Sequence, residues 1–145
     1  MELIQPLIDG IFIALEPINL AMVVLGVLIG LFVGAMPGLG SVNGVAILLP
    51  VTFLVPPTAA IIFLAAIYYG AMYGGAISSI MLGIPGASTA VATTFDGRPM
   101  AMKGEADRAL VAAAVASFVG GTISVILFTL FAPPLAEFAL KFGPP

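Results

Sequence analysis

Cysteine and histidine are both absent from this chain of 145 residues. Without cysteine there is no disulfide, no thiol chemistry and no thiolate metal site. Without histidine the chain lacks the commonest metal ligand and the commonest general base at neutral pH. An enzyme working within the apolar segments would have only serine, threonine and tyrosine hydroxyls as nucleophiles, and no acid lies in those segments to act as a base. The composition therefore argues against an enzyme.

Charged side chains are scarce, at 8% of the chain where a soluble domain has about a quarter. Residues 17–95 contain no Asp, Glu, Lys, Arg or His, and residues 109–136 form a second uncharged stretch. Apolar runs longer than about 18 residues are typical of transmembrane helices. The sequence therefore predicts an integral membrane protein in contact with the lipid bilayer. With only four Lys and Arg in the chain, we expect no nucleic-acid partner.

The apolar runs are solid and do not alternate with polar residues, which predicts helices. The predicted fold class is all-α, a polytopic helical membrane protein with discontinuous or re-entrant helices. Full spans are expected near residues 18–36, 58–84 and 109–131. Residues 42–55 are too short to cross a hydrocarbon core of about 30 Å at about 1.5 Å per residue. A half-helix or re-entrant arm is expected there.

Polar residues gather near the ends of the chain and in one loop. Residues 1–16 are mildly amphipathic and are expected at the membrane surface. The loop at residues 95–108 holds three of the four cations, so the positive-inside rule places it in the cytoplasm. Asp96 and Arg98 in this loop could contact a substrate, although a charged turn is the simpler interpretation. The last span is expected to end at Pro133-Pro134.

Glycines recur every fourth residue before the first interruption of the apolar sequence, at Gly26, Gly30 and Gly34. On a helix this spacing makes a stripe without side chains, against which a neighbouring backbone can pack closely. Gly70 and Gly74 repeat the spacing, and helix packing is again the simplest interpretation. The later glycines miss the dinucleotide-binding spacing by one residue and have no P-loop lysine, so we reject nucleotide binding.

Two Pro-Gly breaks interrupt the apolar sequence, at residues 37–40 and 85–86. Unwound backbone at bilayer depth is tolerated only where it is packed in protein or lines a watery cavity. Transporters use such breaks as sites, with half-helix N-termini facing anions and freed carbonyls coordinating cations. The alternative is a pair of kinks satisfied by neighbouring helices. Candidate solute- or ion-binding residues at the breaks are Pro37, Gly38, Gly40, Ser41, Asn43, Pro85, Gly86, Ser88 and Thr89.

Polar side chains next to the breaks can take either of two roles. Ser41 and Asn43 could cap the next half-helix or contact solute. Tyr69 and Tyr73 share a helix face and are added as candidate binding residues. For these tyrosines an interfacial aromatic belt is the ordinary interpretation, and lining a cavity is the alternative.

Four stretches of the chain carry a family resemblance. They read "GAMPGLGSVNGVAILLPVTF", "IYYGAMYGGAISSIMLGIPG", "VATTFDGRPMA" and "APPLAEFALKFGPP", in this order. Together they closely resemble the large membrane subunit of the tripartite tricarboxylate transporters, the TctA family, from about Gly26 onward. The full subunit is much longer, so residues 1–145 are expected to be its N-terminal portion. The family's glycine-proline motifs map onto Gly34, Pro37, Gly38 and Gly40, and onto Tyr69, Gly70, Tyr73, Gly74, Gly75, Pro85 and Gly86.

The resemblance implies a multi-pass secondary transporter of the bacterial inner membrane, driven by an ion gradient and not by ATP. Its cargo would be tricarboxylates or related organic carboxylates. Its implied partners are a small, TctB-like membrane subunit and a periplasmic, TctC-like solute-binding protein. A channel or a non-transporting membrane scaffold remains the alternative, because either would also use helix breaks and small residues.

The coupling ion is predicted from the residues. No ionisable side chain with a proton to carry lies in the membrane segments, whereas backbone carbonyls with Ser, Thr or Asn oxygens suit Na⁺. We therefore expect Na⁺ near Gly38, Gly40, Ser41 and Asn43, and no cofactor besides it.

Overall fold

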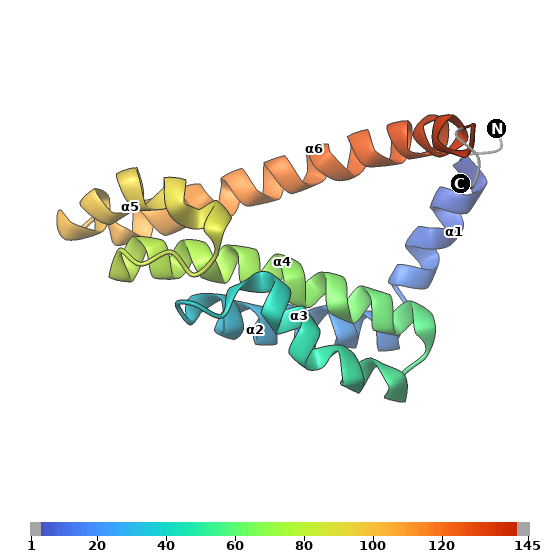
Figure 1. Ribbon diagram of the computed structural model, residues 1–145, viewed down its shortest axis with the longest axis horizontal. Coiled ribbons are helices and arrows are strands. Elements are labelled where there is room, and N and C mark those ends of the chain that lie inside the picture. Colours follow the sequence, from blue (N-terminus) through green and yellow to red (C-terminus); the bar gives the residue numbers. More distant parts are fainter. Residues whose placement is uncertain (1–3, 142–145) are drawn as a thin grey trace. The chain divides into compact units, whose positions relative to one another are not determined.

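All regular secondary structure in the described residues, 4–141 of the computed structural model, is helical (Figure 1). The predicted all-α class is therefore confirmed. Within these described residues, three helices are long and apolar enough to cross a membrane: Pro17–Ala35, Pro57–Leu82 and Ala106–Leu140. The chain divides into two compact units, Met1–Leu110 and Val111–Pro145.

The first unit contains both breaks in the apolar sequence. Prolines stand in the first turns of its second helix, of its fourth helix and of the 3₁₀ helix η1, where the missing N–H costs nothing. Its elements are α1 (Ile4–Ala14), α2 (Pro17–Ala35), α3 (Gly40–Leu48), η1 (Leu49–Leu54), α4 (Pro57–Leu82), η2 (Ser88–Ala90), α5 (Val91–Met102) and the start of α6 (Ala106–Leu140).

Helices α2 and α4 pack together through interleaved glycines, as the four-residue spacing predicts. A Cβ added to Gly30 would lie 2.9 Å from the backbone nitrogen of Ala71, and one added to Gly74 would lie 2.9 Å from that of Ala35. Real side chains do not approach backbone so closely, so only glycine permits this separation. Ile67 of α4 belongs to the core of this unit and is fully buried. Many large side chains of α2, such as Val24, Leu28 and Phe32, are exposed, as lipid-facing residues are.

Helix α3 and η1 form a short arm that folds back on α2 and α4. The arm covers Gly40–Leu54, close to the predicted half-helix at residues 42–55. It meets the other helices at Gly44, whose added Cβ would lie 2.8 Å from the Val33 side chain and 3.8 Å from that of Ile67. A glycine here lets the arm lie directly against the α2–α4 pair.

The loop predicted at residues 95–108 is mostly helical, which corrects that prediction. Helix α5 runs from Val91 to Met102, so only a short turn remains before α6. Packing decides this: Gly97 of α5 lies against Ile80 of α4, its added Cβ 2.7 Å from the Ile80 side chain. The Arg98 guanidinium donates a hydrogen bond to the carbonyl of Met81 at the end of α4. Arg98 therefore closes a helix C-terminus, as a charged turn would, and does not line the pocket described below.

The second unit consists, in its described part, of the remainder of α6. The span predicted at residues 109–131 was expected to end at Pro133-Pro134, but α6 continues to Leu140 with both prolines inside it. The expected end is therefore wrong. Each proline removes one N–H donor, whereas leaving the helix within a bilayer would leave several backbone groups without partners. The helix is the less costly choice.

Candidate functional site

The two Pro-Gly breaks come together at Gly86. A Cβ added to Gly86 would contact the carbonyl oxygen of Gly34 and would lie 2.7 Å from Ser78 Oγ and 3.0 Å from Gly75 Cα. On the other side, the carbonyl oxygen of Gly86 lies 4.0 Å from the Cβ position of Gly40. Two interruptions that are far apart in the sequence therefore lie next to each other at Gly86.

The first break reverses the chain through two glycines in the left-handed region. Gly38 has φ +90° and Gly40 has φ +70°, values that only glycine adopts without strain. Helix α2 has already ended at Ala35, and α3 begins at Gly40 with no side-chain hydrogen bond to cap it. The opening N–H groups of a helix have no intrahelical acceptor. The first N–H groups of α3 are therefore hydrogen-bond donors without a side-chain cap.

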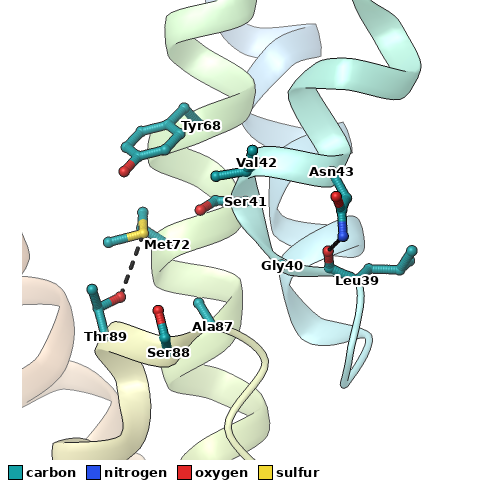
Figure 2. A pocket seen from close by; sticks show the side chains of 10 residues that line it. All are labelled: Leu39, Gly40, Ser41, Val42, Asn43, Tyr68, Met72, Ala87, Ser88 and Thr89. Atoms are coloured by element: carbon teal, nitrogen blue, oxygen red, sulfur yellow. Dashed lines mark hydrogen bonds between the residues drawn. The ribbon is translucent and has the colours of Figure 1, made fainter.

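A pocket of about 200 Å³ lies beside this uncapped end, between the start of α3, one face of α4 and η2 (Figure 2). Five predicted binding residues line it, from both breaks: Gly40, Ser41, Asn43, Ser88 and Thr89. The structure thus brings the polar residues after each break into one space. Their role in binding stays a prediction.

The other six predicted residues do not line this pocket. Pro37, Gly38, Pro85 and Gly86 form the bends that carry the lining residues. The Tyr69 side chain is exposed, and the Tyr73 hydroxyl donates a hydrogen bond to the carbonyl oxygen of Leu110 at 3.2 Å.

The pocket is lined instead by the neighbouring face of α4, which carries Tyr68 and Met72. These two residues have the same four-residue spacing as Tyr69 and Tyr73. The signal for them was therefore present in the sequence, but spacing alone cannot tell which of two adjacent faces turns inward. Leu39, Val42 and Ala87, the remaining lining residues, were also missed because they carry no polar side chain.

Ser41 is the polar side chain most enclosed by this pocket. Its exposed fraction is 7%, and its hydroxyl has no hydrogen-bond partner among the described residues. Figure 2 shows its oxygen directed to the side where Tyr68, Met72 and Ser88 lie. Asn43 differs, because its amide nitrogen donates to the carbonyl oxygen of Leu39 at 2.6 Å. Neither side chain caps α3, so the capping alternative is wrong for both.

Tyr73→Phe and Tyr68→Phe form a matched pair that separates a structural hydroxyl from a pocket hydroxyl. Tyr73→Phe removes the bond to Leu110 and is expected to lower the free energy of unfolding by about 1 kcal/mol, with the affinity of the pocket for a solute unchanged. Tyr68→Phe is expected to alter affinity and leave stability nearly unchanged. Thermal unfolding and equilibrium binding on the purified membrane protein measure both. The reverse pattern would contradict the placement of the two rings.

The apolar helices of spanning length define an integral membrane protein. Its uncharged pocket lies where the helices are interrupted by the two breaks. The family can be stated as well. The chain belongs to the tripartite tricarboxylate transporter TctA family, whose model matches residues 20–145. The resemblance read from the motifs is thereby confirmed.

One relative illustrates the match. A protein of Agrobacterium vitis, described as an uncharacterized 52.8 kDa protein in the TAR-I ttuC' 3' region, is 46% identical over 145 residues. The chain spans 29% of that relative's length, and the match covers 100% of the chain. No solved structure matches the chain.

Proposed function

We propose that the chain forms part of the large membrane subunit of a tripartite secondary transporter in the bacterial inner membrane. In this proposal a periplasmic solute-binding protein delivers a tricarboxylate or related organic acid, and a small membrane subunit completes the complex. Membership of the TctA family supports this function. Within the structure, the observation that carries it is the pocket formed where the two helix breaks meet.

The arrangement suits a carrier for a physical reason. Secondary transporters place solute at discontinuous helices, because interrupted backbone supplies donors and acceptors that a continuous helix uses internally. Here the glycine-packed α2 and α4 give a rigid support, and the short α3 arm presents its free end to the pocket. The pocket provides groups that can bind a solute, and none of its ten lining residues is an acid, a lysine, an arginine or a histidine.

Counterflow tests the function. Vesicles with the complete transporter, loaded with unlabelled carboxylate, are expected to accumulate labelled carboxylate transiently above its outside concentration. A channel cannot do this, because flow through a pore only runs down each gradient. Equilibration without overshoot would favour the channel, and no substrate movement at all would favour a scaffold.

Sodium coupling is the finer part of the proposal. The carbonyl oxygens of Gly38 and Gly40, with side-chain oxygens of Ser41 and Asn43, are the kind of ligand that Na⁺ takes. Residues 17–95 contain no acid or base that could carry a proton instead. Coupling through this break is supported by that chemistry.

Uptake is therefore expected to follow the Na⁺ gradient. Replacing external Na⁺ by choline should reduce the initial uptake rate at least about tenfold, because the coupling ion and its gradient are then absent. Collapsing the pH gradient at constant Na⁺ and constant membrane potential should leave the rate unchanged. Uptake that ignores Na⁺ and disappears with the pH gradient would contradict sodium coupling.

A further inference from the structure

Three elements line the pocket. The first turn of α3 with Ser41 forms one side, Ser88 and Thr89 of η2 form another, and Tyr68 and Met72 of α4 form the third (Figure 2). The Thr89 hydroxyl is turned to the Met72 sulfur at 3.6 Å. The opening N–H groups of α3 and the Ser41 hydroxyl therefore lie together on one side of the pocket as donors without a side-chain partner.

Charge on this side of the pocket favours an anion. The N-terminus of a helix carries about half a positive charge, and no side chain caps α3, which is nine residues long. Ser41 adds a second and independent feature, a hydroxyl on a residue with 7% exposure that has no described partner and faces the pocket. The hydroxyl opens into the pocket, so a bound acceptor can take its hydrogen bond there.

The size and charge of the pocket limit what it can hold. Its volume of about 200 Å³ is smaller than the roughly 300–1,000 Å³ of sites for drug-sized ligands. None of its ten lining residues carries a positive side chain. A second or third carboxylate on the same molecule would find no counter-charge in this lining.

We infer that this pocket is a subsite for one carboxylate end of the substrate, bound by the opening N–H groups of α3 and by the hydroxyls of Ser41 and Ser88. The carbon chain next to that carboxylate lies against Tyr68 and Met72. A serine hydroxyl donates one hydrogen bond and can still offer a lone pair, so Na⁺ on the carbonyl side of the break is compatible with this subsite. The inference rests on the proposed carboxylate transport.

A single thiol provides the test. The chain contains no cysteine, so Ser41→Cys places one reactive sulfur in the subsite with little change in volume. The rate of labelling by N-ethylmaleimide, a neutral reagent, is measured in native membranes. Three additions are compared at the same Na⁺ concentration: sodium propionate, sodium chloride, and propionamide with sodium chloride.

Sodium propionate at about ten times its dissociation constant is expected to slow labelling of the Ser41→Cys protein about tenfold relative to sodium chloride. Propionamide, which has the same shape and no negative charge, should give little protection. Ser88→Cys tests the other break in the same way and keeps the inference testable if Ser41→Cys does not fold. Lys103→Cys, in the exposed turn before α6, should label at one rate in all three solutions.

Two other labelling results would contradict the inference. Labelling that propionate slows no more than sodium chloride does would overturn the carboxylate subsite, and so would equal protection by propionamide. Because labelling requires no transport, these results are distinguishable from failure of the proposed function. Protection in a protein that carries no carboxylate across the membrane would refute transport and retain the subsite.

Discussion

Gly34→Ala is expected to prevent α2 from packing on α4 and to leave little folded protein in the membrane. The added Cβ would contact the carbonyl oxygen of Ala71 and would lie 2.6 Å from both the carbonyl carbon and the Cα of that residue. These atoms are backbone of a helix and cannot rotate away as a flexible side chain could. Overpacking of a core costs about 1–3 kcal/mol and occasionally more, and here we expect the upper end of that range or beyond.

Gly121→Ala is the matched control for this substitution. Gly121 is also a helix glycine in a predicted span, but nothing lies within 4 Å of its Cβ position in the described structure. Alanine there should be neutral, or stabilise by up to about 1 kcal/mol through helix propensity. The yield of monodisperse protein and its midpoint of thermal unfolding compare the two. Similar behaviour of both variants would contradict the close α2–α4 contact.

Gly86→Ala is expected to separate the two breaks and to weaken carboxylate binding. Its Cβ would press on the carbonyl oxygen of Gly34 and on Ser78 Oγ, which lies 2.7 Å away. Either α2 or the second break must then move, and the two breaks no longer lie next to each other. Because the lining residues Ser41 and Ser88 belong to different breaks, we expect affinity to fall at least about tenfold, or about 1.4 kcal/mol.

Equilibrium binding of labelled carboxylate measures this loss, with folding checked by thermal unfolding of the same sample. Gly10→Ala is the control, since nothing lies within 4 Å of the Cβ position of Gly10 in α1. A Gly86→Ala protein that is folded and binds as tightly as the Gly10→Ala protein would show that the site does not depend on contact between the breaks.

Much of the fold could be predicted because the membrane simplifies the problem. The uncharged stretch at residues 17–95 has few structures open to it other than helices. The spacing of the glycines around Gly30 and Gly74 predicted close packing on a neighbouring helix, since a stripe without side chains is useful only against another backbone. The structure adds that the two stripes pack on each other.

The errors came where backbone hydrogen bonding or packing overrode local sequence preference. Pro133 and Pro134 end helices in water, but in α6 the continued helix keeps more backbone groups satisfied. Helix α5 extends into the expected loop because Gly97 packs on Ile80 and Arg98 binds the end of α4. Neither contact can be read from one sequence, because each joins residues from different helices.

Half of the candidate site was predictable for a similar reason. Ser41 directly follows the first break and Ser88 lies two residues after the second, so the bends place them wherever the bends meet. Tyr68 required the rotation of α4 about its axis to be known, and the alternating Tyr, Gly and Met residues there leave more than one face equally plausible. The contact of the two breaks at Gly86 depends on the three-dimensional path of the chain.

A double-mutant cycle across the two breaks tests the central claim, that both form one carboxylate site. Affinity for the transported carboxylate is measured for the wild-type protein, Ser41→Ala, Ser88→Ala and the double variant. Residues that share one ligand are expected to be coupled by at least about 0.5 kcal/mol, whereas independent sites add within about 0.3–0.5 kcal/mol. Losses that are clearly non-additive are the predicted result, and two losses that simply add, or no loss in either single variant, would contradict a shared site.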